Sequence, residues 1–303
     1  MPTIATSQLS TSLNSGNLAN VDGPANLGTI VPLIGWIGSL FVFFFTVDCI
    51  TLTKFGISSI FIFMNFIRLI VLSLFIFTAS HADTIYNLIK IPNLEIYETQ
   101  TVNKLRYLYA KKPFTVGLEK NIKCYNSEKK ILDEKYKIIK KNLDKYERSF
   151  LKKINLKYIV LCEDLSISNI NTAGIPDNEM KTLILDVKFN EKYFERVIHH
   201  EVFHIINDSF KDIFNQTTWS KFNLNNFEYA ECSTCTDKLG LDTYGNTKGF
   251  FSEYSQSTAS EDMAEVFSHL MIGTSLKNQD SILESKINFI RKNLLKIDPN
   301  FIL

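Results

Sequence analysis

The chain has 303 residues, of which 45% are hydrophobic and 21% are charged. This length and composition predict one or two globular domains with a sizeable apolar core. The 33 basic residues nearly balance the 32 acidic residues, and the Lys-rich stretch 111–157 is interleaved with acids. We therefore interpret that stretch as a solvated helix face and predict no nucleic-acid partner.

Apolar residues near the beginning of the chain gather in two blocks, residues 30–47 and 55–78. Each block is close to the length that spans a membrane. The second block also has the pattern of a secretory signal peptide: Arg68 near its start, an apolar middle, and a small-x-small cleavage site at its end. We expect residues 64–82 to be this signal peptide.

This interpretation predicts an exported protein, periplasmic or secreted. Translation then begins at the internal methionine Met64, residues 1–63 lie outside the folded domain, and the mature chain begins near Asp83. The alternative is a membrane-anchored protein that associates with the bilayer through residues 29–79. Arg68 favours the signal peptide, because an arginine at the centre of a spanning helix costs about 2.5–3.5 kcal/mol.

Five cysteines occur in the chain, and Cys49 lies in the apolar region. The other four are Cys124, Cys162, Cys232 and Cys235. An even set in an exported chain is compatible with disulfides. Cys232 and Cys235 have the spacing of half a structural zinc site, but the chain has no second such pair, so a disulfide or free thiols are favoured.

The first part of the mature chain gives mixed signals. Residues 83–125 indicate only short helical pieces, whereas residues 127–154 have apolar side chains at helical spacing and predict one amphipathic helix. Residues 158–162 and 182–187 read as buried strands. Between them, residues 171–178 contain a glycine and a proline and predict a turn.

A helix from residue 191 to about Asp208 is expected next, with Asn190 as its N-cap. Its core stripe is Phe194, Ile198, Val202 and Ile205. His200 and His204 lie about 100° away from that stripe, so one face can anchor the helix while another presents the imidazoles.

The segment 209–250 is long, polar and aromatic, and a loop of this length is expected to cover or border a site. After it, Ser260 can cap a helix over residues 261–272 that Gly273 ends. Ser281 starts a final amphipathic helix through residue 295.

The segment 200–204 reads His-Glu-Val-Phe-His and sets two imidazoles one helical turn apart with a carboxylate between them. This is the pattern of zinc metallopeptidases, in which His200 and His204 bind the metal and Glu201 is the general base. By chance it arises in about one sequence of this length in 200. The alternative is two incidental histidines. His199 adds an ambiguity of register, but only 200 and 204 have the spacing that aligns both rings.

A third ligand has to come from elsewhere, since catalytic zinc sites typically take three protein ligands. Glu261 and Glu265 share one helix face, so one can bind the metal while the other accepts a hydrogen bond from a ligand histidine. The alternative is that Glu261 only starts a helix, in a capping box with Thr258.

These segments, VIHHEVFH at 197–204 and EDMAEVF at 261–267, with a tyrosine seven residues before the second, resemble the catalytic domain of anthrax lethal factor and related bacterial zinc-binding metallopeptidases of the gluzincin class. The resemblance covers about residues 145–275. It implies a zincin-like α+β fold in which an active-site helix and a glutamate helix hold the metal. We therefore expect residues 83–303 to form a zinc metallopeptidase domain with that core.

The resemblance also implies roles for single residues. Glu261 would be the third zinc ligand, Glu265 would support a ligand histidine by a hydrogen bond, and the Tyr254 hydroxyl would help to stabilise the oxyanion. The longer metzincin pattern with a third histidine is absent after His204.

Together these residues predict hydrolysis of peptide bonds in a protein or peptide by a water that one Zn²⁺ per chain activates. By analogy with zincins, residues 182–187 would be a sheet edge that binds an extended peptide. One alternative is an exported, non-catalytic zincin-fold module that binds a partner or acts like a toxin. A membrane-embedded protease is disfavoured, because Glu195, Arg196 and Asp208 flank the metal motif.

Overall fold

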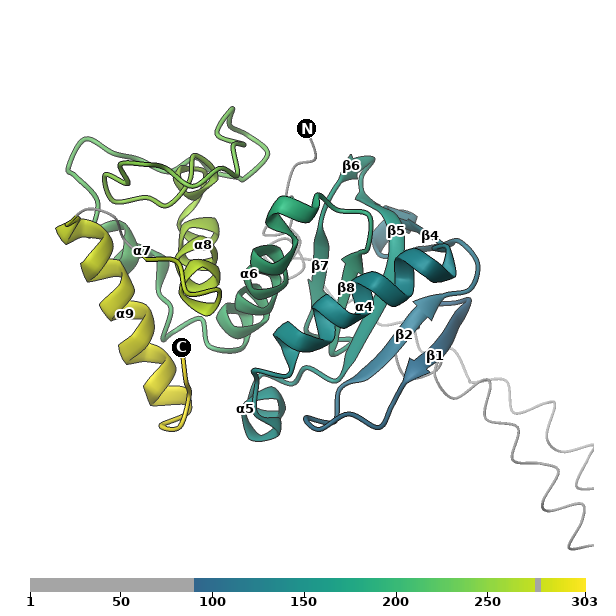
Figure 1. Ribbon diagram of the computed structural model, residues 1–303. Helices are drawn as coiled ribbons and strands as arrows, with labels where there is room; N and C mark the ends of the chain where they lie inside the picture. Colours follow the sequence, from purple (N-terminus) through teal and green to yellow (C-terminus); the bar gives the residue numbers. More distant parts are fainter. Residues whose placement is uncertain (1–89, 276–278) are drawn as a thin grey trace, which may run out of the picture. The chain divides into compact units, whose positions relative to one another are not determined.

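The computed structural model describes residues 90–275 and 279–303, which belong to one compact unit of the chain (Figure 1). The expectations for residues 1–82, among them the signal peptide at 64–82 and membrane association through 29–79, lie outside the described residues. Within the described ranges, no helix is long and apolar enough to cross a membrane.

Five strands form the main sheet in the spatial order β1, β2, β5, β8 and β7. Their bounds are Leu94–Glu98 (β1), Arg106–Ala110 (β2), Tyr158–Ile167 (β5), Thr182–Asp186 (β8) and Gly174–Asp177 (β7). Strands β2, β5 and β8 are parallel, whereas β1 and β7 pair antiparallel at the two edges. Three more strands extend the sheet along the far half of β5: Phe114–Val116 (β3), Ile122–Tyr125 (β4) and Ile170–Asn171 (β6).

Side chains alternate along β5 and β8 and divide the core into two clusters. One face contributes Ile159, Leu161, Leu183 and Leu185 to the larger cluster, which the helices complete. The other face contributes Val160, Cys162 and Ile184 to a smaller cluster with β3 and β4. A disulfide between Cys124 and Cys162 joins β4 to β5 within the smaller cluster.

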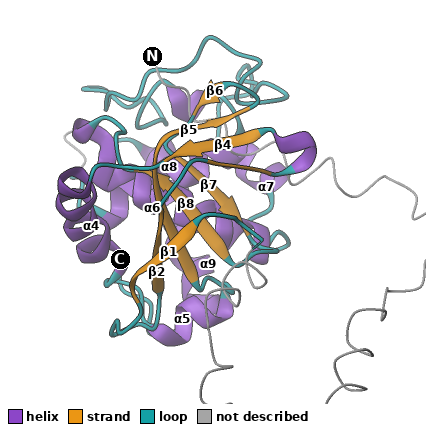
Figure 2. Cartoon of the chain, turned by 90° about the vertical axis from the view of Figure 1, so that its right-hand side faces the viewer, coloured by secondary structure: helices purple, strands orange, loops and turns teal. Residues whose placement is uncertain are grey.

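The helices pack into the larger cluster. They are Lys129–Leu143 (α4), Arg148–Lys153 (α5), Glu191–Ser209 (α6), Gln216–Ser220 (α7), Ala259–Met271 (α8) and Ser281–Ile297 (α9). In Figure 1, α6 lies between the sheet and α8, and α9 lies on the far side of α8. In Figure 2 the strands lie in front of α6 and α8. Every residue of α6 from 196 to 207 is therefore buried, including the face that carries the histidines.

The mixed α and β architecture agrees with the predicted fold class, and the strands at 158–162 and 182–187 are confirmed. The prediction that the strand at 182–187 is a sheet edge is wrong. Strand β8 pairs with β5 on one side and with β7 on the other, so β7 is the edge.

Three further expectations are also wrong. The described part of 83–125, residues 90–125, holds β1 to β4 and one short 3-10 helix, Leu118–Lys120, rather than helical pieces alone. Strands of three to five residues are too short to show a clear alternation. Residues 171–178 include β7, since an edge strand tolerates Pro176. The helix expected over 127–154 is broken after Leu143, where the chain turns to bury Tyr146 in the core.

The helix starts are predicted to within a few residues. Asn190 is the N-cap of α6, and its side chain accepts a hydrogen bond from the Lys192 amide. The cap of α8 is Thr258 rather than Ser260, and the cap of α9 is Asp280 rather than Ser281.

Candidate metal centre

Helix α6 presents His200 and His204 toward α8. The spacing of four residues places both rings on one side of the helix, and their Nε2 atoms lie 3.1 Å apart. His200 is fully buried and His204 is 5% exposed. Two imidazole nitrogens therefore point at one position between the helices.

Helix α8 brings a carboxylate to the same position. The Thr258 side chain accepts a hydrogen bond from the Glu261 amide and fixes the first turn of the helix. Glu261 then faces α6, with its Oε2 atom 2.9 Å from His200 Nε2 and 3.2 Å from His204 Nε2. These three side chains form a group that could hold a metal ion.

The donor set fits zinc. A tetrahedral zinc with bonds of about 2.0–2.1 Å holds its ligand atoms about 3.3 Å apart, close to the observed separations of the three atoms. Two histidines and one glutamate are also a common set in catalytic zinc sites, which leave the fourth position open. The second oxygen of Glu261, Oε1, is buried and has no hydrogen-bond partner among the described residues.

The electrostatics of the group favour a positive charge at this position. Burial lowers the pKa of His200, but the carboxylates of Glu261 and Glu265 outweigh burial and raise that pKa to about 10. Burial raises the pKa of Glu261, but the two histidines outweigh it and lower that pKa to about 2. A buried site with this preference suits a cation.

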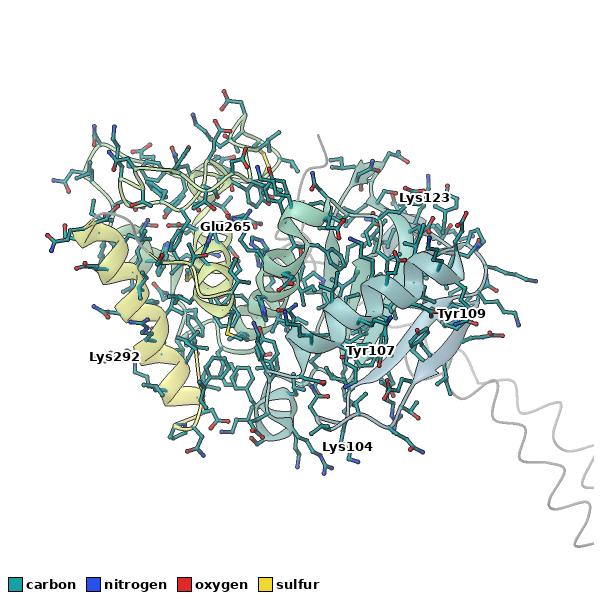
Figure 3. All side chains as sticks on the ribbon, in the orientation of Figure 1. Lys104, Tyr107, Tyr109, Lys123, Glu265 and Lys292 are labelled. Atoms are coloured by element: carbon teal, nitrogen blue, oxygen red, sulfur yellow. A yellow bond between two sulfur atoms is a disulfide. The ribbon has the colours of Figure 1, made fainter. Side chains whose placement is uncertain are left out.

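Two further side chains orient the imidazoles. Glu265 lies on the side of α8 that faces α6 (Figure 3), and its Oε1 atom is 3.1 Å from His200 Nδ1. Ser260 Oγ lies 3.4 Å from His204 Nδ1. When each Nδ1–H donates to its oxygen, each Nε2 keeps its lone pair for a metal. The sequence-based interpretation identifies Glu265 in this position but treats Ser260 only as a helix cap.

Glu201 is buried beside the metal group. Neither of its carboxylate oxygens has a hydrogen-bond partner among the described residues, and the backbone of β7 at Gly174 lies close against the side chain. Burial raises the pKa of Glu201 to about 7. A carboxylate with this pKa can take up and release a proton near neutral pH.

Tyr254 begins a short 3-10 helix, Tyr254–Gln256, just before α8. The side chain is fully buried, and its ring centroid lies 6.0 Å from that of His200. Burial, followed by the nearby carboxylates, raises the pKa of the phenol well above its usual value. The ring therefore lies beside the metal group in its protonated form.

The ambiguity between His199 and His200 is resolved by hydrogen bonds to α4 and the turn after it. The Tyr146 hydroxyl lies 2.7 Å from His199 Nδ1, and Asn142 Oδ1 lies 3.0 Å from His199 Nε2. Burial lowers the pKa of His199 to about 3, so the ring is neutral. Asp208, near the end of α6, forms an ion pair with Lys211.

The long segment before α8 contains one short helix, α7, and is otherwise irregular, with buried contacts along it. Trp219 is fully buried and donates a hydrogen bond to Asp262. Cys232 and Cys235 form a disulfide. The alternative in which these two cysteines are half of a structural zinc site is therefore wrong.

The sequence matches the family described as "putative zinc-binding metallo-peptidase" over residues 129–296, from α4 to α9. The chain belongs to this family. No curated protein matches it. Membership of a zinc-binding metallopeptidase family agrees with the donor set that α6 and α8 bring together.

Proposed function

We propose that this protein is a zinc-dependent peptidase that holds one zinc ion per chain through His200, His204 and Glu261. The observation that carries the proposal is the convergence of His200 Nε2, His204 Nε2 and Glu261 Oε2 on one buried position. The third ligand comes from a separate helix after the histidine helix, which is the arrangement of gluzincins.

Bound zinc would polarise the scissile carbonyl and lower the pKa of the attacking water. Glu201 would accept the proton of that water and return it to the leaving amine, as its pKa of about 7 allows. Tyr254 would donate its hydroxyl proton in a hydrogen bond to the developing oxyanion, because its high pKa keeps the phenol protonated.

The substrate in this proposal is an extended peptide that pairs with the edge strand β7. Strand β7 has no second neighbour among the described strands, so a peptide could add to its outer edge. The same strand passes directly against Glu201 at Gly174. A peptide on this edge would therefore lie near the general base.

The alternative is a non-catalytic module that keeps the fold and binds a partner. Glu201 argues against it, because its buried carboxylate has no hydrogen-bond partner in the described part of the chain, and such burial is costly unless the group has a use. A module without catalysis would gain stability by losing this side chain.

We also propose that the protein works outside the cytoplasm. The support is the pair of disulfides, between Cys124 and Cys162 and between Cys232 and Cys235, since such bonds persist in oxidising compartments. Sequencing of the N-terminus of the protein isolated from its host tests this, because a start near Asp83 is expected after export. A start that retains residues 64–82 on a cytoplasmic protein would contradict it.

Metal analysis of the purified protein tests the ligand assignment. We expect one zinc per chain in the wild type, a sharp fall in Glu261→Ala, and a smaller fall in Glu265→Ala. Glu265 contacts His200 at Nδ1, the nitrogen that does not face the metal position. Equal zinc in the wild type and in Glu261→Ala would contradict the assignment.

Cleavage of a peptide library by the wild type and by Glu201→Gln tests catalysis. The variant should bind zinc as the wild type does but lose nearly all cleavage, since the amide cannot accept the proton of the water. Equal cleavage by both proteins would refute the general base. Full zinc binding without any cleavage by the wild type would favour the binding module.

A further inference from the structure

Arg196 lies one helical turn before His200 on α6 and is 5% exposed. Its guanidinium donates from Nη1 to Glu265 Oε2 at 2.5 Å and to His269 Nε2 at 2.9 Å. From Nη2 it donates to the Leu241 carbonyl at 2.6 Å. One buried cation thus contacts α8 and the long segment before it.

The contact with Glu265 leads to the metal group. Glu265 Oε1 faces His200 Nδ1, while Oε2 accepts from Arg196 and from Ser252 Oγ at 2.6 Å. Burial raises the pKa of Glu265, but Arg196 and then His200 outweigh it and hold that pKa well below its usual range. Arg196 therefore compensates the buried charge of the group that orients a ligand.

The contact with Leu241 leads to Tyr254. The neighbouring Gly240 carbonyl accepts from the Tyr254 amide at 2.9 Å, and the Tyr244 amide donates to the Phe251 carbonyl at 2.7 Å. The segment 240–244 is thus hydrogen-bonded to the segment 251–254, which contains Tyr254. Arg196 is bonded to the segment 240–244 through the Leu241 carbonyl oxygen.

We propose that Arg196 is a positioning residue that couples the orientation of His200 to the placement of Tyr254. The inference rests on the proposed zinc site. Arg196 contacts Glu265, which orients His200. It also contacts Leu241, whose segment pairs with the segment that carries Tyr254. Arg196 is thus the group that joins these two contacts. Loss of the guanidinium should therefore weaken zinc binding and, at saturating zinc, slow the chemical step.

The chain offers a matched control in a second buried ion pair, which joins α9 to α8. Lys286 Nζ lies 2.7 Å from Asp262 Oδ2, and both side chains are fully buried. Asp262 follows Glu261 directly, but its Oδ2 atom bonds Trp219 and Tyr229 rather than a histidine. Lys286 Nζ also donates to the Gly249 carbonyl at 2.8 Å, and neither of its two bonds reaches Glu265 or Leu241. Removing Lys286 therefore removes an equally buried cation and leaves the two contacts of Arg196 in place.

The experiment uses the full-length protein and the variants Arg196→Met, Arg196→Lys and Lys286→Met. Zinc affinity is measured by competition with a chromophoric chelator, folding by circular dichroism, and peptide cleavage at saturating zinc. We expect Arg196→Met to bind zinc 10–100-fold more weakly, as is common when a group behind a metal ligand is lost. Its kcat should fall at least tenfold. Arg196→Lys should be intermediate, because it keeps the charge without the planar fork.

Lys286→Met should lose thermal stability but bind zinc within about twofold of the wild type. Equal weakening of zinc affinity in Arg196→Met and Lys286→Met would overturn the inference, since it would make Arg196 a merely structural residue. Wild-type zinc affinity and kcat in a folded Arg196→Met would also overturn it.

A double variant covers the case in which Arg196→Met does not fold. Arg196→Met with Glu265→Gln removes the charge that needs compensation, so it should bind zinc within about twofold of Glu265→Gln alone. A further tenfold loss would show that Arg196 does not act through Glu265. A wild-type protein that binds no zinc would overturn the proposed function itself. The comparisons between variants cannot produce this result, so the two failures are distinguishable.

Discussion

Strand β7 passes so close to α6 that Gly174 has no room for a side chain. A Cβ at this position would lie 2.6 Å from Glu201 Cγ, 3.0 Å from Glu201 Cδ and 3.2 Å from the Ile184 carbonyl. Ordinary carbon contacts are about 3.5–4.0 Å, so Gly174→Ala requires a displacement of about 1 Å. The backbone has little freedom to move, because β7 is bonded to β8 and α6 is buried between the sheet and α8.

We expect Gly174→Ala to displace Glu201. Overpacking of this kind costs about 1–3 kcal/mol in the free energy of unfolding. A shift of about 1 Å in a catalytic group lowers the rate by about 100-fold. Zinc content should be unchanged, because the steric conflict involves neither histidine nor Glu261. Urea unfolding, metal analysis and peptide cleavage at saturating zinc measure the three quantities.

Gly245→Ala is the matched control, since a Cβ there meets no atom within 4 Å. It should retain the stability and the activity of the wild type. Gly174→Ala with wild-type stability and cleavage would refute the close approach of β7 to Glu201, the proposed general base. Equal losses in both variants would show that the effect is not specific to this contact.

Burial raises the pKa of Asp186 to about 6, above its value of about 3.9 in the unfolded chain. Ionisation of Asp186 therefore lowers the free energy of unfolding as pH rises from 4 through 6. Relative to the wild type, Asp186→Asn should gain up to about 3 kcal/mol between pH 4 and pH 7.5 in urea unfolding, and a difference independent of pH would contradict this. The disulfide between Cys124 and Cys162 spans 38 positions and that between Cys232 and Cys235 spans three. Replacing the first pair by alanines should cost about 4 kcal/mol and the second about 2 kcal/mol, and the reverse order would argue against loop closure as the cause.

The histidine helix was predictable because its signals agree. Asn190 provides a cap, the apolar stripe has helical spacing, and the two histidines have the spacing of a metal site. Glu261 and Glu265 were predictable to a lesser degree, since only their shared helix face and the family resemblance distinguish them from an ordinary helix start. Such signals lie within one short stretch of the chain, so the sequence alone reveals them.

The features that sequence reasoning missed have two causes. Strand β7 lies directly before β8 in the chain, but Gly174 and Pro176 make it read as a turn. The other features depend on contacts between distant segments. Arg196 was noted only as a charge beside the metal motif, because its partners lie 45 to 73 positions away. Ser260 looked like a helix cap, since its distance to His204 follows from the packing of α8 on α6.

His199 and His200 are chemically identical neighbours, yet the fold gives them opposite surroundings. His199 bonds Tyr146 and Asn142. A rotation of α6 by one residue that placed His199 at the metal position would turn Ile198 toward these two polar groups, and both would lose their bonds. Helix α4 therefore sets the angle at which the metal group is presented, although it supplies no ligand. A minimal catalytic unit transplanted to another scaffold would have to include α4, and the family match begins at its first residue, Lys129.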